Sequence, residues 1–415
     1  MKESPEVDVI KSSLKQLVIW LLLLWERLES GVVYNLASQR TRSYPYDVYD
    51  NLRERDPVHR LRLLKAHLLT SYEDVDRVLR DHRRFSNSRR GFAFTELRTL
   101  LHSDPPSHTR LRGLILKAFT SRAVNKLEPR TREIMDELLD AVEGSGRFDL
   151  MRAVAFPLPI IVISELLGIP SEDRKKFEDW SNRLAKSVEP VLSDEEISGI
   201  RSAWDSVYEY FDAVIDERRT DPKDDLISSL VFARDEGNKL THEEVLLTLL
   251  LLLVAGNETT RNLIGNGMLA LLDHPDQMKA LRDDPELMGS AIAEMLRFDS
   301  PVQLDGRFVE EDVVIGGKTI KAGMQVLCSL GAANRDPKVF SDPECFDISR
   351  SGATNLAFGR GIHYCIGASL AVLEAKSAFS GVLNRYPSIR LVERPEYQDQ
   401  LVLRGVKELW VEVTR

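Results

Sequence analysis

The stretch from residue 358 to residue 367 reads Phe358-Gly359-Arg360-Gly361-Ile362-His363-Tyr364-Cys365-Ile366-Gly367. Its glycines permit positive φ angles and let the backbone approach a flat partner closely. A thiolate at Cys365 can ligate a metal from one side of such a loop. A lone cysteine is more often a small buried hydrophobe than a metal ligand, so the choice between these two roles depends on the residues around it. The glycines and the nearby histidine favour the ligand role.

Two other motifs fit this loop poorly. A dinucleotide fingerprint would need a glycine where Tyr364 stands. A structural zinc site needs four ligands, usually in closely spaced pairs, and His363-x-Cys365 has no second pair.

The loop resembles the heme-binding loop of the cytochrome P450 superfamily, the heme-thiolate monooxygenases, whose soluble bacterial members carry a histidine two residues before the cysteine. The resemblance implies that Cys365 is the axial ligand of heme b iron. It also implies that Phe358, Gly359, His363 and Gly367 belong to the cofactor site. An axial thiolate pushes electron density toward an O–O bond. Further matching segments extend the resemblance over residues 44–415.

Composition narrows the function classes. The chain has 415 residues, 43% of them hydrophobic, which is enough for a large core. Its formal net charge of −9 gives no reason to expect nucleic-acid binding. Three scattered cysteines argue against a disulfide framework and for a reducing compartment, so we expect a cytoplasmic protein.

The N-terminus differs from the rest of the chain. Residues 17–25 form an unbroken apolar run of nine residues, whereas a spanning helix needs about 20. Three interpretations remain open: a helix docked on the protein, an interfacial membrane helix, or a protein-contact patch. We therefore expect an N-terminal extension over residues 1–43, followed by a catalytic domain over residues 44–415. Residues 14–36 are the expected site of self-association or peripheral membrane contact.

Helical patterning dominates, and strand-like segments cluster near both ends of the catalytic part. This pattern predicts a mainly α fold with a smaller β-rich part, and the resemblance implies the cytochrome P450 fold. Gly316-Gly317 between Val314-Ile315 and Thr319-Ile320 is a hairpin signal. The strand-like segments are Val58–Leu63, Ala66–Thr70, Val302–Val309, Val313–Ile320 and Leu401–Val413.

One long central helix is expected over residues 242–273. Thr241-x-x-Glu244 is a capping box, and His274-Pro275 stops the pattern. The first half is almost entirely apolar, so the helix should be buried on all sides and cross the protein. Its length would be about 48 Å.

Inside this helix lies Ala255-Gly256-Asn257-Glu258-Thr259-Thr260. The helix could simply emerge into solvent here. The alternative is that Ala255 and Gly256 leave room for a ligand while Glu258 and Thr259 form a polar notch. The segment is similar to the family's acid–alcohol pair. The resemblance implies that Thr259 hydrogen-bonds dioxygen in the binding groove and that Glu258 relays protons, which is general acid chemistry.

Glu294 and Arg297 lie three residues apart on the next expected helix, over residues 286–298. On spacing alone, a surface ion pair of little energetic value is the simpler interpretation. Glu294-x-x-Arg297 also matches the family's E-x-x-R motif. The resemblance then implies a buried pair that braces the heme loop, with Arg350 as its third member and with structural roles.

Heme propionates need cationic or donor partners. His108 and Arg112 are four apart and share a helix face, and on spacing alone an ordinary solvated basic face is the simpler interpretation. The resemblance assigns both residues, together with Arg307 and His363, to the propionates.

The substrate pocket is the least defined part of the prediction. By family position, Phe92, Phe94, Leu251, Val302 and Leu304 would line it, although ordinary core packing explains each of them equally well. Their apolar character suggests a lipophilic substrate.

The resulting prediction is a monooxygenase that hydroxylates or epoxidises a lipophilic molecule. It would use O₂ and electrons from a ferredoxin and ferredoxin reductase. Val372 stands where the family commonly has arginine, so the surface where the donor is expected to dock differs here from that of its relatives. The alternatives are a peroxide-driven heme-thiolate oxygenase or isomerase and a non-enzymatic heme-binding sensor. The Glu258-Thr259 pair argues against both, because neither needs a proton relay.

Overall fold

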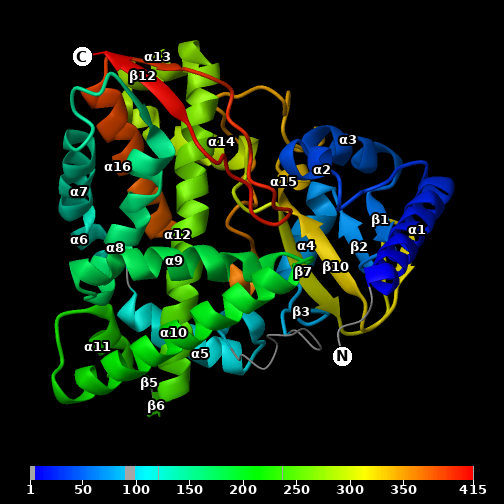
Figure 1. Cartoon of the computed structure of the whole chain (residues 1–415), viewed down its shortest axis with the longest axis horizontal. Helices are drawn as coiled ribbons and strands as arrows, with labels where there is room; N and C mark the ends of the chain where they lie inside the picture. The colour runs from blue at the N-terminus through cyan, green and yellow to red at the C-terminus, as the bar shows by residue number, and fades with distance from the viewer. Residues whose placement is uncertain (1–4, 89–98, 120, 236, 415) are drawn as a thin grey trace.

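A computed structural model describes residues 5–88, 99–119, 121–235 and 237–414. Figure 1 shows a large helical region on one side and a smaller region rich in strands on the other. This arrangement is the mainly α architecture with a β-rich part that the sequence predicts. None of the described helices is both long and apolar enough to cross a membrane.

The helices with their bounds are α1 Pro5–Ser30, α2 Gln39–Ser43, α3 Tyr46–Arg55, α4 Tyr72–Arg80, α5 Ser107–Ala118, α6 Ser121–Lys126, α7 Glu128–Asp140, α8 Pro157–Leu167, α9 Arg174–Ala185, α10 Asp194–Thr220, α11 Leu226–Val231, α12 His242–Asp273, α13 Pro275–Asp283, α14 Met288–Phe298, α15 Leu330–Ala333 and α16 Ala368–Arg385.

The strands are β1 Val58–Leu61, β2 Ala66–Leu69, β3 Phe85–Ser86, β4 Arg147–Asp149, β5 Arg234–Asp235, β6 Asn238–Lys239, β7 Leu304–Val309, β8 Val313–Ile315, β9 Lys318–Ile320, β10 Gln325–Ser329, β11 Ser388–Leu391 and β12 Trp410–Thr414. The main sheet has the order β1-β2-β10-β7-β3, and a second sheet has the order β11-β12-β4. Thus β10, from the second half of the chain, pairs in parallel with β2 from the first half.

The central helix confirms the prediction to the residue. α12 spans His242–Asp273, and both halves of the Thr241/Glu244 capping box are formed. It packs against α8, α9, α10, α14 and α16, and Figure 1 shows it running through the helical region from one end to the other. Apolar residues on all faces of its first half are therefore covered, because helices surround it.

The predicted hairpin between β8 and β9 is also confirmed. Gly316 and Gly317 form its turn with φ angles of +54° and +76°. The prediction of a strand over Leu401–Val413 was wrong in its first part. Only β12 is a strand there, while Leu403 and Val406 make isolated bridges. The backbone pairs only briefly with residues 301–303 there, where the Gln303 amide donates to the Val402 carbonyl and the Arg404 amide donates to the Pro301 carbonyl. The Arg404 side chain is bound by Asp299 and by the Ser43 carbonyl.

Candidate active site

The loop that carries Cys365 is a tight structure closed by its own backbone. The amide of Cys365 donates to the carbonyl of Phe358 over 2.9 Å, and Gly359 and Gly361 have φ angles near +70°. A Cβ on Gly361 would lie 2.6 Å from the carbonyl oxygen of Leu79, so no larger residue fits there. Gly367 then caps α16, which places Cys365 just before a helix N-terminus.

Two opposing influences act on the Cys365 thiol. Burial raises its pKa, while the amide of Gly367 and the charge of Arg112 lower it. The N-terminal end of α16 also favours a thiolate. Without a bound cation the protonated thiol is the favoured form, and a metal would supply the compensating charge.

The residues predicted to bind propionates lie close to this loop. The rings of His108 and His363 are 4.4 Å apart between centroids, and Arg112 Nη2 donates to the Tyr364 carbonyl over 2.7 Å. Arg307 is fully buried and donates to Asn87 and Asp305. The predicted set from α5, β7 and the cysteine loop is therefore brought together at one place.

The histidines in this set are electrostatically unusual. Burial, with help from Arg307 and His108, lowers the pKa of His363 to about 3. Burial and Arg112 also lower the pKa of His108. Both ring nitrogens of His108 and Nε2 of His363 are buried without a hydrogen-bond partner among the described residues. Buried polar atoms normally have partners, so these three atoms indicate a missing ligand.

The central helix opens at the predicted notch. Its buried surface is interrupted at Leu251, Ala255, Gly256 and Thr259, and Ala255 is the most exposed of the four. A Cβ built on Gly256 would meet nothing within 4 Å, which is unusual in the middle of a surrounded helix. One side of α12 therefore borders open space rather than packed side chains.

Glu258 is buried next to this opening in a polar cluster with Arg261 and Gln398. Its Oε1 pairs with Arg261 Nη2 at 2.7 Å, and both side chains are largely buried. The amide of Gln398 from the C-terminal segment also lies against this pair. Burial raises the pKa of Glu258 and outweighs the opposing effect of Arg261. Thr259 donates to the Ala255 carbonyl at 2.7 Å, and its neighbour Asn257 donates to Ser181.

Glu294 and Arg297 on α14 form a buried, two-pronged ion pair rather than a surface pair. The distances are 2.7 Å from Arg297 Nε to Oε2 and 2.8 Å from Nη2 to Oε1, and each side chain is only 2% exposed. Arg350 joins Glu294 at 3.1 Å. Arg297 also donates to the carbonyls of Pro343 and Cys345. The three residues thus fasten α14 to residues 343–350.

The predicted substrate residues are only partly visible. Phe92 and Phe94 lie outside the described residues. Leu251 and Val302 are half-buried, whereas Leu304 is buried in a core cluster with Tyr34 and Leu327. Their roles stay predictions.

Sequence reasoning missed three residues next to the predicted site. Arg261 could have been found, because it lies three residues after Glu258 on the same helix. Gln398 gave no sequence signal, because it reaches Glu258 from a distant segment. Glu374 on α16 was also missed. It is 2% exposed beside Thr260, and burial raises its pKa to about 8.

This raised pKa predicts a pH-dependent stability that Glu374→Gln should remove. The group binds a proton more tightly in the folded state than in the unfolded state, where its pKa is near 4.5. Its stabilising contribution is complete below pH 4.5 and is lost as the pH rises toward 8. The slope would be at most about 1.4 kcal/mol per pH unit. Urea unfolding from pH 5 to 8 measures it, and equal slopes for Glu374→Gln and the parent protein would contradict the assignment.

The donor set fits heme b. The unpartnered nitrogens of His108 and His363, with Arg112 and Arg307 beside them, match a group that carries carboxylates. Cys365 supplies a soft ligand for iron, and the space at Gly256 would admit a ligand from the side of α12.

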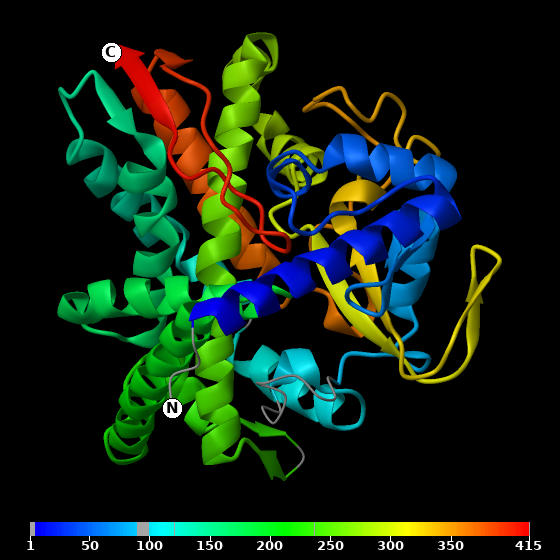
Figure 2. The same ribbon diagram turned by 45° about the vertical axis from the view of Figure 1, so that its right-hand side comes forward.

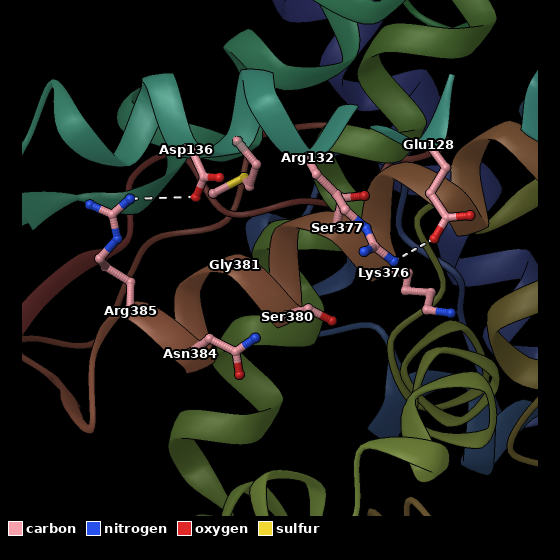
Figure 3. A pocket seen from close by; sticks show the side chains of 10 residues that line it. Glu128, Arg132, Asp136, Lys376, Ser377, Ser380, Gly381, Asn384 and Arg385 are labelled. Carbon is pink, nitrogen blue, oxygen red and sulfur yellow. Dashed lines mark hydrogen bonds and ion pairs between the residues drawn. The ribbon is translucent and has the colours of Figure 1, made fainter. Parts of the chain in front are cut away.

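Two pockets are described outside the opening in α12. One, of about 550 Å³, is lined by Cys365, Arg112, Leu116, Tyr364 and Val372 among others. The other, of about 510 Å³, lies between α7 and α16 and contains none of the predicted site residues. Figure 3 shows its charged walls, where Arg132 pairs with Glu128 and Arg385 with Asp136.

Comparisons with known proteins identify the family of this chain. A family model described as Cytochrome P450 matches residues 30–406. Cytochrome P450 CYP107DY1 of Priestia megaterium is 46% identical over 312 residues, which are 75% of each chain. Vitamin D(3) 25-hydroxylase of Pseudonocardia autotrophica is 41% identical over 88% of this chain and 93% of its own. The crystal structure of P450BioI in complex with a hexadec-9Z-enoic acid ligated acyl carrier protein is 37% identical. It superposes with a TM-score of 0.87, covering 91% of this chain and 100% of the other. The chain belongs to the cytochrome P450 family and is a heme b-dependent monooxygenase.

Proposed function

We propose that a catalytic domain of residues 44–415 inserts one oxygen atom from O₂ into a lipophilic small organic substrate by hydroxylation or epoxidation. The observation that carries this proposal is the opening of α12 at Ala255, Gly256 and Thr259, directly beside the buried acid Glu258. A heme-binding protein without oxygen chemistry has no need for an acid and an alcohol at such an opening. The three cysteines are free thiols, which supports a reducing compartment such as the cytoplasm.

Cys365 would hold the iron from the side of α16, and His108, Arg112, Arg307 and His363 would hold the propionates. When bound, heme b supplies the activation of O₂ and the transfer of one oxygen atom. The glycines of the cysteine loop keep side chains out of the cofactor's way. The buried, neutral imidazoles donate or accept hydrogen bonds without adding charge, since their pKa values are lowered.

Glu258 and Thr259 would deliver the protons that the reaction consumes. The raised pKa of Glu258 keeps a proton on the carboxyl to higher pH than usual, which suits a general acid. Its Oε2 has no hydrogen-bond partner among the described residues. In this arrangement Arg261 and Gln398 hold the carboxyl, and a side-chain rotation would bring it toward the opening. The Thr259 hydroxyl already borders the opening and would pass the proton on.

The open side of α12 supports a lipophilic substrate, because Leu251 and Ala255 present apolar surface there. Two relatives are named for lipophilic molecules, vitamin D(3) and a carrier-bound hexadecenoic acid. Vitamin D₃ and hexadec-9-enoic acid are therefore the first probes to add, and displacement of the iron's water ligand would report binding as a spin-state shift.

The electron donor is proposed to be a ferredoxin supplied by a ferredoxin reductase. Support comes from the hollow beside Cys365, where Arg112 adds a positive charge next to the apolar Leu116 and Val372. Acidic ferredoxins would meet a complementary charge there.

The decisive experiment compares oxidants. The reduced protein under carbon monoxide should show the strongly red-shifted Soret band of a thiolate-ligated heme. Product should then form with O₂, ferredoxin and reductase. Product with hydrogen peroxide alone, and none with O₂ and reductase, would instead establish the peroxide-driven reaction.

Thr259→Ala should uncouple oxygen consumption from product formation. The variant loses the hydroxyl at the opening but keeps the helix, so we expect product per O₂ to fall about tenfold or more, within the usual range for losing one acid–base group. Peroxide release should rise while the carbon monoxide spectrum stays unchanged. Thr248→Ala is the matched control, because Thr248 makes the same bond to a carbonyl four residues back on α12, at 2.6 Å. Unchanged coupling in Thr259→Ala would remove Thr259 from the relay.

A further inference from the structure

Helix α1 exposes a continuous apolar surface that the cytochrome P450 reaction does not use. Leu17, Leu21, Leu24 and Leu28 are between 37% and 78% exposed. Val18, Trp20 and Trp25 flank them and are each more than half exposed. These seven side chains, here called the α1 stripe, fall on one face of the helix. Isolated exposed apolar residues are ordinary, but a contiguous patch of this kind marks an interaction site.

The opposite face of α1 is fixed to the body of the protein. Glu26 is only 2% exposed, and its Oε1 accepts a 2.7 Å hydrogen bond from the backbone amide of Arg62. His59 Nε2 lies 3.5 Å from Oε2. At the edge of the α1 stripe, the Arg62 guanidinium lies 3.8 Å from the centre of the Trp25 ring, so part of this side chain is already covered. Ile19, Leu22 and Leu23 are half-buried. Glu26 lies about half a helical turn from the stripe, so its anchoring turns the α1 stripe outward.

Figure 2 shows α1, in dark blue, crossing the front of the molecule with its C-terminal end at the strand-rich region. That end contacts β1. Residues 17–28 of α1 are therefore attached to the body of the protein, and the α1 stripe has a defined orientation.

The sequence of α1 carries the spacing of a coiled coil. Apolar residues recur at alternating intervals of three and four: Val7, Ile10, Leu14, Leu17, Leu21, Leu24 and Leu28. Every core position of three consecutive heptads is thus apolar, which is the pattern of a helix that packs along a second helix. The four described members of this series are the exposed leucines of the α1 stripe.

We propose that the α1 stripe packs against the same stripe of a second copy of this chain, forming a two-fold symmetric dimer. Covering the seven side chains would bury roughly 700 Å² per copy, close to the ~800 Å² per partner that a standard stable interface buries. A self-complementary leucine surface suits a two-fold interface, because the same patch serves both copies.

Charge favours a second copy over a lipid surface. Residues 1–30 contain five acidic and four basic side chains, and the whole chain carries a formal net charge of −9. An interfacial membrane helix usually presents a lysine- and arginine-rich polar face to anionic lipids. α1 has no such excess, so attraction to a bilayer would rest on the apolar stripe alone.

Sedimentation velocity of the full-length heme protein tests the dimer. The parent protein should sediment at twice the chain mass of 47.1 kDa. Leu21→Glu/Leu24→Glu should raise the dimer dissociation constant about 100-fold or more, since it places like charges at the centre of the interface. Gln16→Glu is the control, because Gln16 is exposed on α1 outside the stripe. It should leave the mass unchanged, and the carbon monoxide spectrum checks that each variant is folded.

A charge-swap pair gives an independent readout. Leu21→Lys/Leu24→Lys should be monomeric alone and should form a mixed dimer with Leu21→Glu/Leu24→Glu, because each helix then meets opposite charges. A parent protein that stays at 47.1 kDa would overturn the proposal. Binding of that monomer to vesicles of phosphatidylcholine and phosphatidylglycerol would identify a lipid surface as the occupant instead. A dimer that Leu21→Glu/Leu24→Glu leaves intact would also overturn it.

Discussion

Cys365→Ser should abolish the red-shifted Soret band of the reduced carbon monoxide complex and eliminate monooxygenase turnover. A serine hydroxyl is a poor donor to iron compared with a thiolate, and it cannot push electron density toward the O–O bond. We expect product formation to fall at least about 10³-fold, which corresponds to about 4 kcal/mol of transition-state stabilisation. The measurements are the carbon monoxide difference spectrum and product formation under O₂ with an electron donor.

Cys345→Ser provides the matched control. Cys345 is an exposed free thiol in the segment that Arg297 and Arg350 hold, and those contacts use its backbone carbonyl, not its sulfur. This variant should keep both the spectrum and the activity. A red-shifted band that survived in Cys365→Ser but disappeared in Cys345→Ser would move the iron ligand to the other thiol.

The parts of the fold that could be predicted depend on local signals. α12 begins and ends where its capping box and His274-Pro275 predict, because both signals lie within a few residues of the helix ends. The β8–β9 hairpin followed from Gly316-Gly317 for the same reason. The strand expected to begin at Leu401 is absent, because contacts with residues far away in the sequence determine the conformation of that segment. Arg404 is bound by Asp299, which lies 105 residues away.

In the candidate site, too, local motifs could be predicted and contacts between distant segments could not. Cys365 and the acid–alcohol pair could be identified because their motifs are compact in sequence. The contact between Glu258 and Gln398 joins segments 140 residues apart in the sequence, so no spacing rule could reveal it. The exposure of α1 could not be decided either. An apolar run shows that something must cover the helix, but its sequence does not show which side faces the body.

The burial of the Glu294–Arg297 pair could not be predicted from the spacing of its two residues. An interval of three places two side chains on one helix face, which is equally true of exposed pairs such as Arg130 and Glu133. What distinguishes Glu294 is the segment of residues 334–350 packed over it. That segment contributes the carbonyls of Asn334 and Pro343 to Arg297 and the amide of Asp347 to Glu294.

Glu294→Ala should therefore destabilise the protein by about 3–5 kcal/mol, because it leaves the Arg297 charge buried without its carboxylate partner. It also removes the acceptor for the Asp347 amide and for Arg350. Glu133→Ala breaks an ion pair of the same spacing in which the carboxylate is 64% exposed. That control should change stability by less than about 1 kcal/mol.

Urea unfolding followed by circular dichroism, together with the heme content of the purified protein, measures both variants. Because the pair fastens α14 to the segment that precedes the cysteine loop, heme retention should fall together with stability in Glu294→Ala. Glu294→Gln should be intermediate, since its amide oxygen can still accept from Arg297 but carries no charge. If Glu294→Ala proved no worse than Glu133→Ala, the buried pair would contribute no more than a surface pair. The attachment of residues 343–350 would then rest on the backbone contacts of Arg297 and Arg350 alone.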